Sequence, residues 1–294
     1  MKIAMIGHKR IPSREGGIEI VVEELSTRLV IMGHTVYAYN RAGKNVSDKN
    51  ADKEAHKLKT YKGIRLVKIP TPNNKKLNAI VYSFLATIHA VTHNFDVIHY
   101  HAEGPCAMLV IPHFFGIRTI ATIHGLDWQR AKWGGFATKF LKFGEKIAAK
   151  YADEVIVLSR NVQQYFLEQY GRTTIYIPNG VNPIEFKEPG IIVDKYGLEK
   201  EKYILFLARL VPEKGVHYLL EAFSKLDTDY KLVIAGGASH SGEYVDRIKE
   251  QAKKDSRVIL TGFVQGDELV ELFSNAYMYV LPSDVEGMPI SLLE

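Results

Sequence analysis

Short apolar runs alternate with longer amphipathic stretches along the whole chain. In the first half, β-branched and aliphatic runs predict strands at residues 2–6, 35–39, 64–69, 96–100, 119–123, 154–158 and 174–177. Apolar residues at helical spacing predict helices between them, near residues 17–32, 77–92 and 161–170. This alternation is typical of βαβ units in a parallel, doubly wound sheet, so we expect an α/β fold.

A turn-rich passage without periodicity, residues 178–190, precedes a second alternation. Its strands are expected at residues 203–208, 231–235, 258–260 and 277–281, and its helices near residues 216–226, 243–254 and 267–274. We therefore expect two domains, residues 1–180 and 181–294. The chain stops within a helix after four strands and has no capping glycine, so we expect the second domain to be incomplete and the chain to be a fragment.

The composition is that of a folded globular protein, with 46% apolar and 24% charged residues among 294. Cys106 is the only cysteine, which excludes an intrachain disulfide and favours an intracellular location. Apolar runs stay below the roughly 18 residues of a membrane span, and strand residues follow Met1 almost directly instead of a signal peptide. A cytoplasmic protein is expected.

Charge is distributed unevenly along the chain. Residues 1–180 hold 25 Lys and Arg against 14 Asp and Glu, whereas residues 181–294 hold 13 against 19. A basic half can face nucleic acid, an anionic membrane surface or an acidic acceptor, and composition does not choose among them.

Residues 136–150 predict an amphipathic helix with four lysines beside an apolar stripe. The stripe is formed by Phe136, Phe140, Phe143 and Ile147. We favour packing of this stripe into the core, with the lysines in solvent, and keep docking on an anionic membrane as the alternative.

Two glutamates, Glu286 and Glu294, flank a Gly/Pro turn at the end of the chain. Proline suits the first helical position, so Pro289 should begin a helix, with Glu286 in the preceding loop and Glu294 in the second turn. Carboxylates bind sugar hydroxyls, and free amides at a helix start attract phosphate, so the segment favours a ligand that carries hydroxyls and a diphosphate. The alternative is a solvated loop acid and an ordinary helix acid.

Two more loops follow predicted strands and open helices. The first contains Gly16 and Gly17, which can let a phosphate approach backbone amides, or can simply begin a helix. The second contains Arg209 and Lys214, two cations five positions apart that suit a leaving diphosphate. Solvated loop cations are the alternative for that pair.

A polar, aromatic loop follows the predicted strand at residues 119–123. It contains His124, Asp127, Trp128 and Arg130, residue types that suit stacking on a sugar and hydrogen bonding to it. A core histidine would normally lie inside the strand, so we favour a functional role for His124. The other three are candidates for contact with an acceptor.

His99 and His101 alternate about a strand end, so we expect only one of them to face the cleft. His101 lies further out and is the fourth acceptor-side candidate. The sequence has no His/Cys/Asp cluster with convincing metal spacing and no Asp-x-Asp pair at these positions. We therefore expect chemistry that needs no metal.

Together these residues resemble the retaining glycosyltransferases of family 4, whose GT-B architecture has two facing Rossmann-like α/β domains. The resemblance covers the whole chain. The residues that carry it, in family order, are Gly16, Gly17, His124, Arg209, Lys214, Glu286 and Glu294. Residues 123–133 and the loop 7–17 are most similar to bacterial surface-polysaccharide enzymes, including rhamnosyltransferases.

The resemblance implies transfer of a hexose or deoxyhexose from a nucleoside-diphosphate sugar to a glycan or lipid-linked acceptor, with retention and without a cofactor. It implies UDP, GDP or dTDP as the nucleotide. The residues implied for the diphosphate are Gly16, Gly17, Arg209, Lys214, Gly287 and Met288. Pro289 departs from the family pattern, which often has glycine there, and it has no N–H to give to a phosphate.

The remaining implied contacts concern the sugar, ribose and base. Glu286 would hold hydroxyls of the donor sugar, Glu294 those of the ribose, and His124 would lie near the reacting carbon. The backbone of Gly262, Phe263 and Val264 would read the base.

Two other functions stay open. A hydrolysing sugar-nucleotide 2-epimerase would produce a new sugar nucleotide without an acceptor, and a non-catalytic binding module would release no nucleoside diphosphate. The basic first half indicates peripheral association with the inner face of the cell membrane. We expect no nucleic-acid partner, and weak or absent activity for this 294-residue chain.

Overall fold

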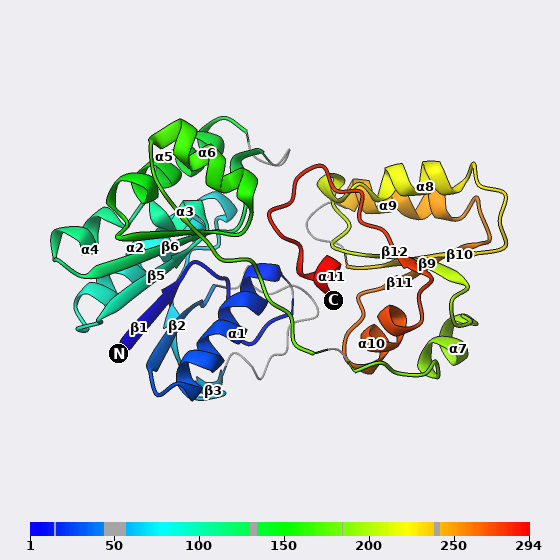
Figure 1. The fold of residues 1–294 in the computed structure, drawn as a ribbon, viewed down its shortest axis with the longest axis horizontal. Coiled ribbons are helices and arrows are strands. Elements are labelled where there is room, and N and C mark those ends of the chain that lie inside the picture. The colour runs from blue at the N-terminus through cyan, green and yellow to red at the C-terminus, as the bar shows by residue number, and fades with distance from the viewer. Residues whose placement is uncertain (15, 44–56, 130–133, 184, 238–241) are drawn as a thin grey trace. The chain divides into compact units, whose positions relative to one another are not determined.

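The computed structural model describes residues 1–294 apart from 15, 44–56, 130–133, 184 and 238–241 (Figure 1). The chain divides into two compact units, an N-terminal unit, Met1–Asn179, and a C-terminal unit, Gly180–Glu294. Each unit contains one sheet that is covered by helices on both faces.

The N-terminal unit is built around an eight-stranded sheet in the order β3-β4-β2-β1-β5-β6-β7-β8. Its strands are β1 (Lys2–Ile6), β2 (Thr35–Arg41), β3 (Thr60–Tyr61), β4 (Ile64–Ile69), β5 (Val97–His101), β6 (Arg118–Ile123), β7 (Glu154–Val157) and β8 (Ile175–Tyr176). Its helices are α1 (Gly17–Ile31), α2 (Lys75–Val91), α3 (Glu103–Cys106), α4 (Val110–Phe114), η2 (Asp127–Gln129), α5 (Phe136–Tyr151) and α6 (Arg160–Tyr170). All strand pairs are parallel except β3 with β4.

Alternate residues of the central strand β1 enter two different cores. Ala4 and Ile6 pack with side chains of α2, α3, α5 and α6, whereas Ile3 and Met5 pack with α1 on the other face. Side chains of successive strand residues point to opposite faces, so a strand that is apolar at every position requires helices on both sides. Among the described helices, α1 packs on one face, and α2, α3, α5 and α6 pack on the other.

The C-terminal unit has a four-stranded parallel sheet in the order β11-β10-β9-β12. Its strands are β9 (Tyr203–Leu207), β10 (Lys231–Ala235), β11 (Val258–Gly262) and β12 (Met278–Tyr279). Its helices are α7 (Ile191–Tyr196), η3 (Pro212–Lys214), α8 (Val216–Phe223), α9 (Gly242–Ala252), α10 (Asp267–Ser274) and α11 (Ile290–Leu293). Alternate residues of β10 again enter two cores, one under α8 and α9 and one under α7 and α10.

The predicted α/β class with parallel sheets is confirmed, and most predicted strands agree with the structure to within two residues. The short elements β3, α3, α4 and α7 were not predicted, because two to six residues are too few to show a period. The predicted strand at residues 277–281 contains only two ladder residues, those of β12.

The last helix begins one residue later than predicted. Pro289 is its N-cap, with extended backbone angles, and α11 then spans Ile290–Leu293. Glu294 therefore follows the last helical residue as the C-cap instead of lying in a second turn.

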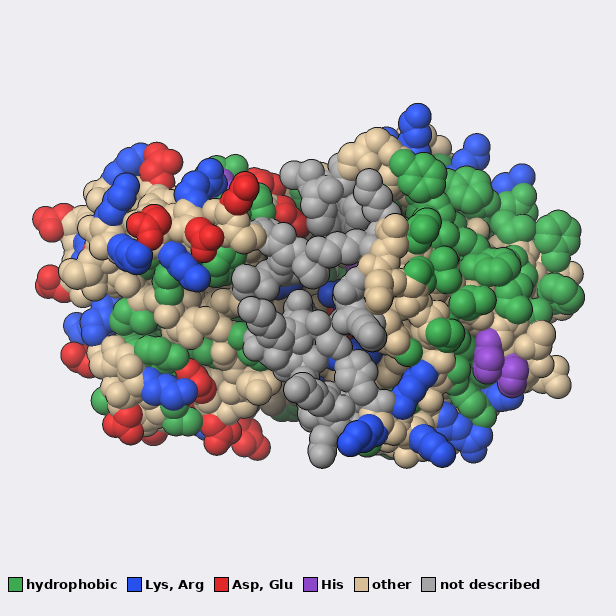
Figure 2. Space-filling view, turned by 180° about the vertical axis from the view of Figure 1, so that it is seen from behind, with side chains coloured by type: hydrophobic (Ala, Val, Ile, Leu, Met, Phe, Trp, Pro, Cys, Tyr) green, Lys and Arg blue, Asp and Glu red, His purple; other side chains and the backbone are tan. Residues whose placement is uncertain are grey.

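The apolar stripe predicted at residues 136–150 does not pack into the core as a whole. Ile147 is buried, but Phe136 and Phe143 are exposed. The buried face of α5 is formed by Leu141, Gly144, Glu145, Ile147, Ala148 and Ala149. Figure 2 shows many exposed hydrophobic side chains on this unit.

Candidate active site

Ligands of doubly wound sheets bind at the carboxyl ends of the strands, where the strand order changes direction. In the N-terminal unit this switch point lies between β1 and β5, and in the C-terminal unit between β9 and β12. The predicted site residues Gly16 and Gly17 follow β1, and His101 ends β5. Arg209 and Lys214 follow β9. Glu286 follows β12, so each unit carries predicted chemistry at its own switch point.

The loop after β9 is held close to the neighbouring backbone by two glycines. A Cβ on Gly215 would lie 1.9 Å from the Pro282 carbonyl oxygen, and Gly215 has φ 68°, a conformation that only glycine adopts without strain. A Cβ on Gly236 would lie 1.8 Å from the Ala208 carbonyl oxygen. Because these positions exclude side chains, Lys214 is placed directly beside the segment that follows β12.

Lys214 and Glu286, 72 positions apart, form an ion pair in the C-terminal unit. Their side chains are 16% and 23% exposed, so both charges reach solvent. The backbone N–H of Asp284 donates to the Glu213 carbonyl at 3.0 Å, which ties the two loops together next to this pair.

Arg209 lies on the same edge of the sheet and is half-buried. Within the described part of the chain, no carboxylate forms an ion pair with its guanidinium group. The backbone on either side is fixed, since Ala208 N–H donates to the Ala235 carbonyl at 3.2 Å and Leu210 N–H to the Gly237 carbonyl at 3.1 Å. The arrangement offers a guanidinium and an ammonium group to an anionic ligand.

Tyr279 connects the two predicted glutamates. Its hydroxyl lies 3.0 Å from the Leu207 carbonyl, to which it donates, and 2.8 Å from the Ser291 hydroxyl, from which it accepts. Burial, with a smaller contribution from the Glu286 and Glu294 carboxylates, raises the pKa of Tyr279 to about 12. Both carboxylates therefore act electrostatically on one hydroxyl, although Glu294 itself is exposed.

The segment predicted to read the base follows β11 on the same edge. Gly262 has φ 76° and its carbonyl accepts from the Gly236 N–H at 2.8 Å. The Phe263 side chain is partly exposed, whereas the Val264 side chain is buried in the core. Only the backbone of Val264 can then contact a ligand. Gly287 and Met288 lie in the half-buried loop between Glu286 and α11.

In the N-terminal unit, the loop after β1 rests on the end of β5. A Cβ on Gly7 would lie 2.1 Å from the His101 carbonyl oxygen, and Gly7 has φ 130°. The Asn40 amide holds the loop further out, since its oxygen accepts from the Ile11 N–H at 2.9 Å and its nitrogen donates to the Ile11 carbonyl at 2.8 Å. The same oxygen lies 3.1 Å from His8 Nε2.

The glycine pair stands at the start of α1, where two acids hold the loop. Glu19 Oε1 accepts from the Lys9 N–H at 2.9 Å, and Glu19 Oε2 lies 2.3 Å from where a Gly16 Cβ would be. The contact with Glu19 therefore gives a structural explanation for glycine at position 16 that needs no ligand. Gly17 is the first residue of the helix.

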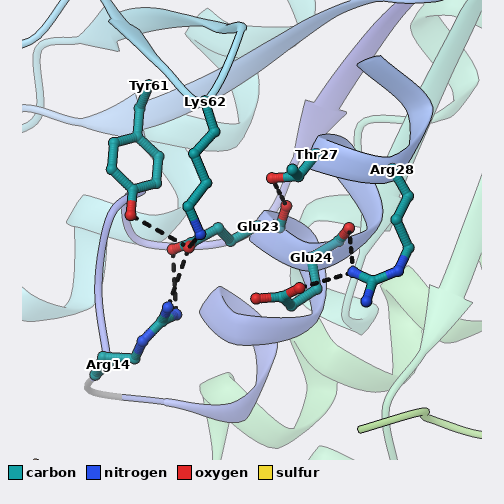
Figure 3. A network of polar contacts seen from close by, with 7 residues as sticks. All are labelled: Arg14, Glu23, Glu24, Thr27, Arg28, Tyr61 and Lys62. Atoms are coloured by element: carbon teal, nitrogen blue, oxygen red, sulfur yellow. Dashed lines mark hydrogen bonds and ion pairs between the residues drawn. The ribbon is translucent and has the colours of Figure 1, made fainter. Parts of the chain in front are cut away.

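Glu23, one turn further along α1, is fully buried and joins three segments of the chain (Figure 3). Its carboxylate accepts from the Arg14 guanidinium at 3.1 and 3.2 Å, from Lys62 Nζ at 3.0 Å and from the Tyr61 hydroxyl at 3.4 Å. Because Arg14 belongs to the loop, the loop is tied to α1 and to the β3–β4 turn.

Three histidines form a stack at the carboxyl ends of β5 and β6. The rings of His99 and His101 are stacked with centroids 4.3 Å apart, and His101 Nδ1 lies 3.1 Å from His124 Nε2. The prediction that His99 and His101 point to different sides is wrong, because residues i and i+2 of a strand share a face. Burial lowers the pKa of His99 to about 3 and that of His101 well below its usual range, so both rings are neutral at pH 7.

The aromatic loop after β6 rests on buried acids. Trp128 Nε1 donates to Glu145 at 3.0 Å, and Lys142 Nζ lies 4.0 Å from the centroid of the Trp128 ring. The Asp127 N–H donates to the Glu103 carboxyl at 3.1 Å. The indole N–H and one face of Trp128 are therefore already occupied. Arg130, the remaining candidate of this loop, lies outside the described residues.

Burial, followed by the nearby Asp127 and Glu145 carboxylates, raises the pKa of Glu103 to about 10, so Glu103 is protonated at pH 7. Glu145 accepts in addition from the hydroxyls of Tyr165, at 2.8 Å, and Tyr170. This network positions the loop after β6 and was not predicted. One signal was available, since Glu145 is the only acid among the four lysines of residues 136–151.

Solved structures share this arrangement of two α/β units. Sucrose-phosphate synthase from Thermosynechococcus elongatus matches with a TM-score of 0.78 at 20% identity, over 99% of this chain and 77% of that one. Anabaena HepE, solved in complex with UDP and glucose, matches with a TM-score of 0.73 at 18% identity, over 96% of this chain and 74% of that one. The fold is therefore that of the GT-B glycosyltransferases.

Sequence comparison gives the family. The family described as Glycosyltransferase Family 4 matches residues 15–185, and that described as Glycosyl transferases group 1 matches residues 191–294. The chain belongs to glycosyltransferase family 4. A relative, the GDP-mannose-dependent alpha-(1-6)-phosphatidylinositol monomannoside mannosyltransferase of Mycolicibacterium smegmatis, is 25% identical in an alignment that covers 96% of this chain and 75% of that protein.

Proposed function

We propose that this glycosyltransferase moves a hexose or deoxyhexose from a nucleoside-diphosphate sugar to a glycan or lipid-linked acceptor in polysaccharide biosynthesis, with retention and without a metal. The observation that carries the proposal is the ion pair of Lys214 and Glu286 at the switch point of the C-terminal sheet, where Arg209 also follows β9. Two cations beside a carboxylate suit a donor that carries both a diphosphate and hydroxyls.

The proposed role of the cations is to stabilise charge that develops as the diphosphate leaves. Arg209 offers a planar fork and Lys214 a point charge, and both bind phosphate oxygens more strongly as their negative charge grows. Donor binding would draw Lys214 from Glu286 to the phosphate, which frees the Glu286 carboxylate for hydroxyls of the sugar. This exchange needs no cofactor.

The other residues have supporting proposed roles. Glu294, which like Glu286 acts electrostatically on the Tyr279 hydroxyl, is proposed to bind the ribose hydroxyls. The residues proposed to contact the diphosphate and the base through their backbone are Gly16, Gly17, Gly262, Phe263, Val264, Gly287 and Met288. His124 is proposed to contact the transferred sugar, and His101, Asp127 and Trp128 are proposed to serve the acceptor side.

The comparisons support more than one donor nucleotide. The mycobacterial relative is named for GDP-mannose and a phosphatidylinositol monomannoside, whereas HepE was solved with UDP. We therefore keep UDP, GDP and dTDP as candidates. A lipid-linked acceptor would place the protein in the cytoplasm, at the inner face of the cell membrane.

The test is a screen of UDP-, GDP- and dTDP-sugars for release of nucleoside diphosphate, with and without candidate acceptors and with and without a metal chelator. The proposal expects release from one donor, unchanged by the chelator, and a glycoside product with the anomeric configuration of the donor. A new sugar nucleotide formed without acceptor would instead identify a 2-epimerase. Tight donor binding without release would identify a binding module.

A further inference from the structure

Helix α2 packs apolar residues into the core and also exposes a second set of apolar side chains to solvent. Leu77, Phe84, Leu85 and Ile88 are between 37% and 50% exposed. Their spacing of seven, one and three residues places them along one face of the helix. A helix on the surface of a soluble domain normally turns such a face toward the core.

The core side of α2 contains Tyr82, Ala86 and Ala90 together with buried polar groups, and these polar groups are satisfied. Asn78, Ser83 and Thr87 are buried. Asn78 Nδ2 donates to Thr71 Oγ1 at 2.8 Å, Ser83 Oγ donates to the Ala79 carbonyl at 2.8 Å, and Thr87 Oγ1 lies 2.9 Å from the Tyr100 hydroxyl. The bonds of Asn78 and Thr87 have partners outside α2 and would be lost if the helix rotated, so the outward apolar residues belong to the folded state.

The apolar surface continues onto the neighbouring helices. Helix α4 packs against both α2 and α5, and it ends in Phe114 and Phe115, which are 82% and 68% exposed. We call the surface formed by Leu77, Phe84, Leu85, Ile88, Phe114, Phe115 and Phe143 the apolar face. Figure 2 shows hydrophobic side chains gathered on the side of the molecule where the N-terminal unit lies, with Lys and Arg side chains around them. Single exposed apolar residues are ordinary, but a contiguous group marks an interaction surface.

Helix α5 adds positive charge beside the apolar face. Lys139, Lys142, Lys146 and Lys150 are all exposed. The described parts of α2, α4 and α5 contain one acid, Glu145, which is buried against Trp128, Tyr165 and Tyr170. The surface therefore combines exposed aromatic rings with exposed lysines.

We propose that the apolar face of the N-terminal unit docks on an anionic lipid bilayer. Aromatic and aliphatic side chains would enter roughly the outer 5–10 Å of the bilayer, and the lysines would contact anionic headgroups. None of the described helices has the length and apolar character that a membrane crossing requires, so the contact is peripheral. A second copy of the chain fits less well, since a two-fold axis would bring the two sets of lysines together.

The proposal is independent of the transferase reaction, and its test measures binding alone. The protein is sedimented with vesicles of phosphatidylcholine, with and without phosphatidylglycerol, over a range of salt concentrations. Wild-type protein is expected to bind the anionic vesicles more tightly, and less so as salt rises. Phe84→Ser with Phe115→Ser should weaken binding by about tenfold for each phenylalanine. Lys146→Gln with Lys150→Gln should weaken it by about fivefold for each lysine at low salt.

The matched controls lie on other surfaces of the same unit. Ile31 and Met32 are exposed at the end of α1, on the opposite face of the sheet, so Ile31→Ser with Met32→Ser should bind as wild type. Lys57→Gln with Lys59→Gln is the control for charge. The proposal is overturned by absence of wild-type binding, or by equal binding of the control and apolar-face variants. It is also overturned by a lipid-independent dimer that Phe84→Ser with Phe115→Ser dissociates, which would show a second copy on this surface.

Discussion

The switch points of the two sheets are built in opposite ways. In the N-terminal unit the groups at the strand ends are buried and uncharged, with His99 and His101 neutral and Glu103 protonated at pH 7. In the C-terminal unit the corresponding position holds the ion pair of Lys214 and Glu286, which reaches solvent. The same edge of the same type of sheet thus carries buried neutral histidines in one unit and a partly exposed ion pair in the other.

The two switch points suit different tasks. The N-terminal one suits positioning of a sugar, and the C-terminal one suits compensation of the charge on a leaving group. Buried groups with fixed partners keep one geometry, which suits holding a sugar, but they have no charge to offer a leaving group. Partly exposed ions can change partners at low cost and can follow charge as it develops. We therefore expect substitutions in the C-terminal pair to act on rate, and substitutions in the N-terminal network to act on stability.

The largest effect is expected from Lys214→Ala. Loss of the ammonium group removes stabilisation of the leaving diphosphate, so kcat/KM for the donor should fall by about 100- to 1,000-fold, while stability changes by less than about 1 kcal/mol because the pair is only partly buried. Steady-state kinetics of nucleoside-diphosphate release and urea unfolding measure the two effects. Lys225→Ala, which breaks an exposed pair with Glu221, is the control. Near wild-type turnover of Lys214→Ala would remove the proposed role.

In the N-terminal network, Glu145→Ala should destabilise the fold. It leaves the donors of Trp128, Tyr165 and Tyr170 without their acceptor, at a cost of about 3 kcal/mol in the free energy of unfolding. Urea unfolding provides the measurement, and Glu154→Ala is the control, because its pair with Arg118 is exposed and 3.9 Å long. Equal stability of the two variants would contradict a network held by Glu145.

The neutral histidines should make stability depend on pH. The pKa of His99 is lowered in the folded state from 6.5 to about 3, so below pH 6.5 the unfolded chain binds a proton that the folded protein does not. The contribution of neutral His99 to the free energy of unfolding is complete above pH 6.5. It is lost as the pH falls towards 3, at about 1.4 kcal/mol per pH unit.

His99→Gln removes this titrating group. The difference between the free energies of unfolding at pH 7 and pH 5 should therefore shrink by about 2 kcal/mol relative to wild type. Chemical unfolding at the two pH values measures it. Burial also lowers the pKa of His8, to about 4. His8→Gln should therefore reduce the same difference in the free energy of unfolding. An unchanged difference in both variants would mean that these rings are charged in the folded protein.

The same contrast explains what the sequence could predict. Arg209, Lys214 and Glu286 were found because they follow strands of a parallel sheet, and strand ends share an edge regardless of their separation along the chain. Glu145 and Tyr279 were missed, since their importance comes from partners in other elements. The period of α2 predicted a helix, but a period does not tell which apolar residues face the core, and here α2 has apolar residues on both its buried and its exposed side.

The smallest effect is expected from Tyr279→Phe, which tests how the two carboxylates of the C-terminal unit are positioned. Loss of the hydroxyl removes its bonds to the Leu207 carbonyl and to Ser291, at a cost of about 1 kcal/mol in the free energy of unfolding. Because α11 would be held less firmly, KM for the donor should rise about fivefold with kcat unchanged, an equivalent of about 1 kcal/mol in binding.

Tyr277→Phe, two residues away with an exposed ring, is the control and should behave as wild type. A large fall in kcat for Tyr279→Phe would show that the hydroxyl takes part in the reaction, and the C-terminal switch point would then contain a buried neutral group of the kind found in the N-terminal unit. An unchanged KM would show that Glu286 and Glu294 keep their places without this contact, so the partly exposed ion pair alone would distinguish the two switch points.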